Sequence, residues 1–119
     1  MKKIPKELDL SALVGEVTTQ IRVGQYDIQF SIGKVNFSIW SPIKIIRDGK
    51  EIGNWEENKW PDSAFLEVLN IKVSKYEIRD FKFIALYFEN GVEMNFGIND
   101  EQFESMSIYI EGESAPWFM

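Results

Sequence analysis

The 119-residue sequence contains no cysteine and no histidine. Without cysteine the chain can form no disulfide, no thiolate zinc site and no cysteine nucleophile. Without histidine it has no imidazole base, no Ser-His-Asp triad and no histidine-ligated metal. The glycines are dispersed among predicted turns, so neither a Walker A loop nor a dinucleotide-binding fingerprint is present. We therefore predict that the protein is not an enzyme and binds no cofactor and no metal.

Long hydrophobic runs are also missing. No apolar run approaches the 18 residues of a membrane-spanning helix. The first ten residues include a proline, a glutamate and an aspartate where a signal peptide needs an apolar core. We therefore expect a cytoplasmic protein that has no membrane partner. Hydrophobic residues make up 45% of the chain, which is typical of one folded domain over residues 1–119.

Positive charge is absent from the last third of the chain. Lys82 is the last basic residue, whereas residues 83–119 still carry seven carboxylates, and the formal net charge is −6. A surface of one sign repels phosphate backbones and can steer a basic protein partner. The pattern therefore argues against a nucleic-acid partner. It fits either a binding surface for a basic protein or an ordinary solvated surface.

Residues 81–98 carry the strongest hairpin signal in the chain. A two-residue Asn90-Gly91 loop would place apolar residues opposite polar ones. A three-residue loop that ends with Gly91 in the left-handed region instead pairs Leu86 with Met94 and Ile84 with Phe96. Because a one-residue slip moves every side chain to the other face, the apolar pattern favours the second register.

Alternating apolar residues predict strands along most of the chain. The expected fold is α+β and mainly antiparallel, with about eight strands, one short helix near residues 61–69 and possibly another near 6–13. Residues 31–34 are expected to form a four-residue hairpin loop that pairs Phe30 with Val35. The chain divides into two similar four-strand halves, which suggests an internal duplication of residues 10–52 and 66–110. In this comparison Val35, Phe37 and Ile39 match Val92, Met94 and Phe96.

Two tryptophans are the best candidates for a contact surface. Trp55 and Trp60 flank Glu56 and Glu57 in a segment that we expect to be an exposed loop. Tryptophan surrounded by polar groups is a favoured residue in protein interfaces. The alternative is that both rings fold back and cover the sheet and the helix.

A second candidate surface is acidic. Asp100, Glu101 and Glu104 precede the last predicted strand. Carboxylate oxygens suit Mg²⁺ or Ca²⁺, but the spacing matches no known calcium loop, and the same residues suit a solvated loop. We assign no metal and expect these carboxylates to contact a protein partner.

The chain resembles the small, acidic, β-rich immunity proteins of bacterial polymorphic-toxin and contact-dependent inhibition systems. The residues that carry the resemblance are Leu13, Val14, Gly15 and Val17, then Phe88, Asn90, Gly91 and Val92, then Phe103, Glu104 and Ser105. The resemblance implies a protein that binds a cognate toxin domain and occludes its active site, often that of a nuclease with a basic cleft. The expected contacts are Trp55, Glu56, Glu57, Trp60, Asp100, Glu101 and Glu104. An assembly protein that self-associates through a sheet edge is the alternative, and either a monomer or a homodimer is compatible with the sequence.

Overall fold

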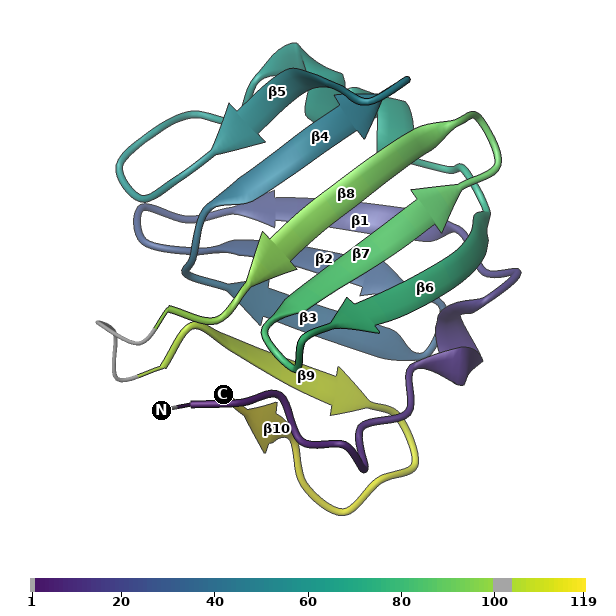
Figure 1. Ribbon diagram of the computed structural model, residues 1–119, viewed down its shortest axis with the longest axis vertical. Coiled ribbons are helices and arrows are strands. Elements are labelled where there is room, and N and C mark those ends of the chain that lie inside the picture. Colours follow the sequence, from purple (N-terminus) through teal and green to yellow (C-terminus); the bar gives the residue numbers. More distant parts are fainter. Residues whose placement is uncertain (1, 100–103) are drawn as a thin grey trace.

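The chain forms two antiparallel β-sheets that lie face to face (Figure 1). The computed structural model describes residues 2–99 and 104–119. One sheet has the strand order β1-β2-β3-β9-β10 and the other has the order β5-β4-β8-β7-β6. The strands are β1 (Thr18–Val23), β2 (Ile28–Ile32), β3 (Val35–Ile39), β4 (Ile43–Arg47), β5 (Lys50–Trp55), β6 (Val73–Arg79), β7 (Phe83–Phe88), β8 (Val92–Gly97), β9 (Met106–Ile110) and β10 (Trp117–Phe118). Two 3-10 helices, η1 (Ser11–Leu13) and η2 (Ser63–Val68), precede β1 and β6.

The hydrophobic core fills the space between the two sheets. Along β2 and β3 the buried residues alternate with half-buried polar ones, as expected for strands that present one face to a core. Phe37 of the first sheet meets Phe96 of the second edge to face, with ring centroids 5.6 Å apart. This arrangement is among the favoured geometries of aromatic pairs and joins the two layers at their centre.

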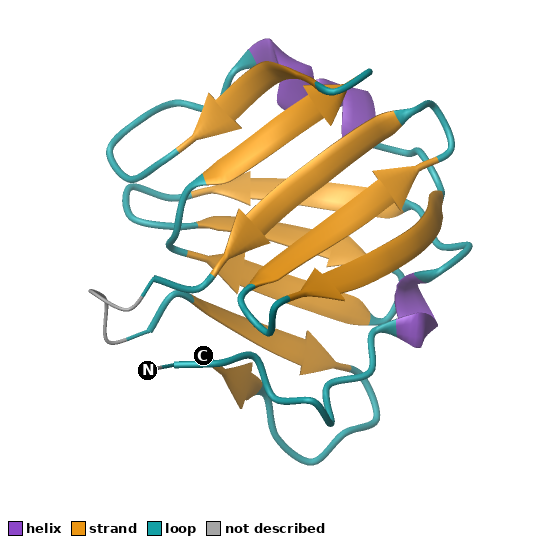
Figure 2. Cartoon of the chain, in the orientation of Figure 1, coloured by secondary structure: helices purple, strands orange, loops and turns teal. Residues whose placement is uncertain are grey.

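The predicted α+β class is wrong in its helical part. The antiparallel sheets are confirmed, but the predicted count of about eight strands is wrong, because the described residues contain ten. They contain two short 3-10 helices and no α-helix, so the fold is mainly β, and strands dominate the view in Figure 2. The helix expected near residues 61–69 is the 3-10 helix η2, whose six residues bury Phe65 and Val68. A 3-10 helix aligns residues three apart on one side, and a segment this short gains too little from helix propagation to stabilise an α-helix.

The helix expected near residues 6–13 is also wrong. Only Ser11–Leu13 are helical, as η1. The Asp9 carboxylate accepts the N–H of Ser11 at 2.9 Å, and the N–H of Leu8 donates to the Pro5 carbonyl at 3.1 Å. These local bonds form turns that compete with a regular helix. No helix among residues 2–99 and 104–119 is long and apolar enough to cross a membrane.

The predicted register of the hairpin at residues 81–98 is confirmed. Leu86 faces Met94 and Ile84 faces Phe96, and Gly91 has φ +84°. The other predicted loop, at residues 31–34, is wrong because β2 and β3 continue until Ile32 faces Val35.

The loop between β2 and β3 thus contains only Gly33 and Lys34. Gly33 takes φ +57° at the first loop position, as a type II′ turn requires. The predicted register pairs Phe30 with Val35, whereas in the structure Phe30 faces Phe37, a shift of two residues. Such a shift keeps every side chain on its face, so apolar alternation could not distinguish the two registers.

The two halves of the chain follow the same path and exchange their fourth strands. In each half three consecutive strands form a meander, β1-β2-β3 or β6-β7-β8. The next strand of each half then joins the sheet of the other half, so β3 pairs with β9 and β8 pairs with β4. The registers agree: Val35, Phe37 and Ile39 face Ile110, Ile108 and Met106, while Val92, Met94 and Phe96 face Arg47, Ile45 and Ile43.

The segments that enter the two meanders are also matched. The N–H of Gly15 donates to the Val73 carbonyl at 2.8 Å, and the N–H of Asn70 donates to the Thr18 carbonyl at 2.7 Å. Gly15 and Asn70 both have positive φ, at +85° and +62°. Each half therefore donates a backbone hydrogen bond to the start of the other half's first strand. The gene duplication that would explain this match stays a prediction.

Candidate functional site

The four predicted contact residues near η2 separate into one buried and three exposed side chains. Trp55 is only 1% exposed, so its predicted role in a contact surface is wrong. It ends β5 opposite Ile43, and the strand extends farther than the sequence pattern indicated. Trp60, in contrast, is 78% exposed, and Glu56 and Glu57 are exposed in the same loop.

The predicted acidic contacts lie elsewhere in the chain. Asp100 and Glu101 lie outside the described residues. Glu104 is half-buried and lies in the connection that leads into β9. The described structure therefore places Glu56, Glu57 and Trp60 together and leaves Glu104 on a separate segment.

A groove of about 830 Å³ runs between β1 and the segment that contains η2. We call it the η2 groove. Its lining residues are Thr19, Gln20, Ile21, Arg22 and Val23 on one side and Trp60, Pro61, Asp62, Ser63, Phe65, Leu66 and Leu69 on the other. Trp60 also lines a smaller hollow of about 430 Å³ against the β1–β2 turn.

Hydrogen bonds close the η2 groove at its two ends. At one end the N–H of Asn58 donates to the Gln25 carbonyl at 3.0 Å. At the other end the N–H of Asn70 donates to the Thr18 carbonyl, and Leu69 forms a parallel bridge with Thr18. Between these bonds, residues 19–23 form the outer edge of their sheet, because β1 pairs with β2 alone.

The outer edge of β1 presents unpaired backbone groups to the groove. The N–H of Gly24 donates to the Asp27 carbonyl at 2.8 Å, which makes this pair a hydrogen-bonded one across the β1–β2 hairpin. Because hydrogen bonding alternates along an antiparallel pair, the N–H and C=O groups of Ile21 and Val23 point away from β2. An edge of this kind can accept a further extended chain.

The helical side of the groove is apolar and exposed. Leu66 is 68% exposed and Leu69 is 38% exposed, and residues three apart in a 3-10 helix lie on the same side. Phe65 points the other way, is 2% exposed and stacks on Phe30 with ring centroids 6.3 Å apart. Phe65 therefore anchors η2 to the first sheet, while Leu66 and Leu69 stay available at the surface.

Asp62 holds the start of η2 against β5. Its carboxylate accepts the backbone N–H of Asn54 at 2.8 Å and pairs with the Lys59 ammonium at 3.3 Å. The hydrogen bond from Asn54, followed by that from Lys59, lowers the pKa of Asp62 below its ordinary value of 3.8. The ionised carboxylate thus fixes the loop that carries Trp60.

Arg22 is the charged residue of the groove that lacks an acidic partner. Its guanidinium donates to the side-chain oxygens of Gln20, Gln29 and Ser31 at 2.7 to 3.0 Å. Among the residues that the structure describes it forms no ion pair, so it remains able to bind a carboxylate.

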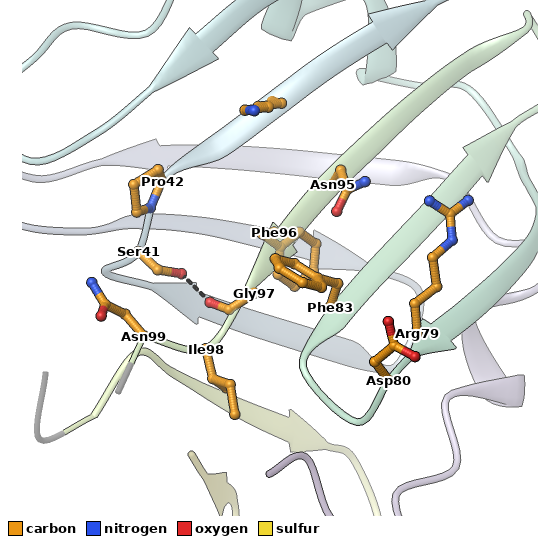
Figure 3. A pocket seen from close by; sticks show the side chains of 11 residues that line it. Ser41, Pro42, Arg79, Asp80, Phe83, Asn95, Phe96, Gly97, Ile98 and Asn99 are labelled. Atoms are coloured by element: carbon orange, nitrogen blue, oxygen red, sulfur yellow. Dashed lines mark hydrogen bonds between the residues drawn. The ribbon is translucent and has the colours of Figure 1, made fainter. Parts of the chain in front are cut away.

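A second concavity, of about 630 Å³, lies over β4, β7 and β8 (Figure 3). Two of its polar side chains already have partners. The Ser41 hydroxyl donates to the Gly97 carbonyl at 2.6 Å, and Arg79 forms ion pairs with Glu77 and Glu93. The η2 groove is the better candidate site because it combines an open sheet edge with exposed apolar side chains.

The contributions of β1 and of Leu66 to this site were not predicted from the sequence. Ile21 and Val23 belong to an alternating strand pattern, which reports burial but not whether the strand lies at a sheet edge. Leu66 falls outside the apolar stripe predicted for an α-helix, and in the 3-10 helix η2 it lies on the exposed side with Leu69. No local signal could have placed β1 beside η2.

Comparisons with models of protein families, with curated proteins and with solved structures found no match to this chain. Among residues 2–99 and 104–119, no three carboxylate-type side chains gather in a way that could hold a metal ion. The arrangement of the η2 groove is suited to contacts with an apolar, extended chain.

Proposed function

We propose that this protein is a non-enzymatic binding protein that neutralises a cognate bacterial toxin domain in the cytoplasm. The observation that carries the proposal is the exposure of Trp60, which stands 78% exposed at the rim of the η2 groove. A large aromatic ring held in the open by a fixed loop is typical of a residue that is buried on binding.

The surroundings of Trp60 support an interface of ordinary composition. Leu66 and Leu69 supply apolar area, while Glu56 and Glu57 supply a charged rim. A polar rim around an apolar centre is the usual anatomy of protein interfaces. The net charge of −6 would attract a basic partner such as a nuclease domain.

The proposed mechanism is occlusion of the toxin's active site. Carboxylates at the rim would take the place of substrate phosphates in a basic cleft, and Trp60 would anchor the complex. Asp100, Glu101 and Glu104 are proposed as a second acidic contact, in keeping with the absence of basic residues beyond Lys82.

Self-association through a sheet edge is the second candidate function. The observation in its favour is the outer edge of β1, which has no partner strand among the described residues. A light-scattering mass equal to that of the 13.9-kDa monomer would contradict this reading.

The decisive experiment is co-expression with the product of the gene immediately upstream, followed by co-purification. We expect a one-to-one complex that protects cells from that product. Trp60→Ala should weaken the complex by roughly 30-fold or more, the loss expected for a hot-spot side chain worth about 2 kcal/mol.

The matched control is Phe118→Ala, which removes another exposed aromatic ring, 59% exposed, from β10. Reversal of Asp100, Glu101 and Glu104 to lysine tests the acidic contact separately. Absence of any complex would refute the proposed function, and equal loss in Trp60→Ala and Phe118→Ala would refute the assigned surface.

A further inference from the structure

The η2 groove has a counterpart in the other half of the molecule, and there the chain fills it. The matching registers place Tyr76 of β6 where β1 has Ile21, because Tyr76 faces Leu86 as Ile21 faces Phe30. In the same way Ile78 takes the place of Val23. The edge of β6 is thus the structural equivalent of the edge that lines the groove.

The segment along the edge of β6 is the N-terminal arm, residues 2–10. The N–H of Ile4 donates to the Phe81 carbonyl, and the N–H of Leu10 donates to the Tyr76 hydroxyl at 3.2 Å. Ile4, Leu8 and Leu10 are buried, with exposed fractions of 1%, 4% and 0%. The arm therefore closes its opening of the sandwich with aliphatic side chains.

The matching segment before β6 supplies fewer apolar side chains. Leu10 and Leu13 of the first half correspond to Phe65 and Val68, which are buried in the same way. Ile4 and Leu8 correspond to the stretch 59–63, whose sequence is Lys-Trp-Pro-Asp-Ser. Where the first half buries Ile4 and Leu8, the second half therefore has no aliphatic side chain, and the η2 groove lies beside that stretch.

We infer that the η2 groove binds a short extended segment of a protein partner that carries two aliphatic side chains. This inference rests on the proposed binding function and names the part of the partner that is recognised. The aliphatic side chains contact Ile21, Val23 and Leu66, and they supply the apolar groups that Ile4 and Leu8 supply in the other half. Trp60 closes over the bound segment at the rim.

The edge of β1 adds recognition of the segment's backbone. The outward N–H and C=O groups of Ile21 and Val23 bond an extended chain laid beside them, as in strand addition to a sheet edge. Hydrogen bonds at Thr18 and Gln25 limit the open edge to residues 19–23, so about five residues of the partner fit. Arg22 favours an acidic residue next to the aliphatic pair.

The inference can be tested with a phage-displayed library of random seven-residue peptides and the immobilised full-length protein. We expect enrichment of peptides with two aliphatic residues, and amide shifts at Ile21 and Val23 together with an indole shift at Trp60 when a selected peptide is added. Leu66→Asp should weaken binding about tenfold or more, because it places a charge against the apolar side chains. Leu66 is largely exposed, so this variant should fold.

The matched control is Ile52→Asp, which introduces the same charge at an aliphatic residue of β5 that is 39% exposed and does not line the groove. It should leave peptide binding unchanged. N-methylation of a selected peptide should weaken binding where the methylated backbone nitrogen faces β1. Methylation of the alternate nitrogens, which face away from β1, should have little effect. Failure to enrich any peptide, enrichment without aliphatic residues, or equal binding by Leu66→Asp and wild type would overturn the inference.

The outcomes separate this inference from the proposed function. If selected peptides bind the groove but the upstream gene product forms no complex, the groove is a binding site and toxin neutralisation is refuted. If the complex forms and Leu66→Asp leaves its affinity unchanged, the toxin is bound elsewhere and the segment inference fails.

Discussion

Val17 and Lys72 face each other in an antiparallel bridge that lies outside the named strands. They are equivalent positions of the two halves, so the bridge joins the halves at matching points of the chain. The bonds on either side are matched as well, from Gly15 to Val73 and from Asn70 to Thr18. This junction sets the relative position of β1 and β6, and through them that of the two sheets.

Substitutions at the junction should show how much the left-handed backbone conformation of its residues affects the free energy of unfolding. Gly15 has φ +85°, and a Cβ at this position would meet no atom within 4 Å. Gly15→Ala should therefore lower the free energy of unfolding by about 1 to 2 kcal/mol through backbone strain alone. Urea denaturation measures this difference.

Asn70 provides the opposite test at the equivalent position. Its φ is +62°, which glycine adopts without strain. Asn70→Gly should leave the unfolding free energy within about 0.5 kcal/mol of wild type, whereas Asn70→Ala should destabilise like Gly15→Ala. Equal effects of the glycine and alanine variants at position 70 would contradict the strain argument.

Alanine substitution of the two tryptophans that flank Glu56 and Glu57 should have opposite effects on stability and on binding. Trp55 is 1% exposed, so Trp55→Ala leaves a cavity and should cost about 3 to 5 kcal/mol of stability. Trp60→Ala should change stability by no more than about 0.5 kcal/mol, since the ring is mostly in water. Urea denaturation of both variants, with binding measured on the same samples, would separate the structural role from the contact role.

Gly53 and Ala64 should behave as a coupled pair. A Cβ on Gly53 would come within 2.7 Å of the Ala64 Cβ, which is closer than such atoms approach in proteins. Gly53→Ala should therefore push η2 away from β5 and destabilise the fold by roughly 1 to 3 kcal/mol. It should also weaken the binding of peptides to the η2 groove.

The double variant Gly53→Ala with Ala64→Gly relieves that contact. A double-mutant cycle should give a favourable coupling between the two changes, since the residues touch. Strict additivity of the two stability changes would show that η2 does not press against β5 at this point.

The stability of the fold should depend on the ionisation of Asp62. The hydrogen bond from Asn54 lowers the pKa of Asp62 in the folded state below 3.8. A lowered pKa stabilises the folded state above the unfolded pKa, and this contribution is lost as the pH falls through the folded pKa. Asp62→Asn should therefore reduce the decrease in the urea midpoint that wild type shows between pH 5 and about pH 2.

Glu56→Gln is the control for this prediction. Its carboxylate is exposed, and among the described residues its side chain accepts no hydrogen bond. The pH profile of Glu56→Gln should follow that of wild type. If Asp62→Asn also follows wild type, the bond from Asn54 does not depend on the charge of Asp62.

Local pattern predicted much of the sheet structure. The hairpin at residues 81–98 has the register that its apolar alternation indicated, because one slip would expose a whole face. The similarity of the halves was also visible in Val35, Phe37 and Ile39 against Val92, Met94 and Phe96, whose registers agree. The toxin-binding role remains a prediction.

Helices and exposure were predicted less well. The apolar spacing over residues 61–69 suits an α-helix, yet the segment is held by bonds to Asn54 and Thr18 at its two ends and forms only the six-residue 3-10 helix η2. Trp55 was placed in an exposed loop because its neighbours are polar. In the fold it continues β5 and is buried opposite Ile43.

The sequence by itself determined most of the strands, the apolar side of each of them and the turn at Gly91, because these depend on side chains close together in the chain. Only the tertiary structure decided that the halves exchange their fourth strands, that β1 ends a sheet and that η2 lies beside it. These features depend on contacts between residues far apart in sequence. The η2 groove is made by such contacts, so the candidate site could be recognised only once the chain was folded.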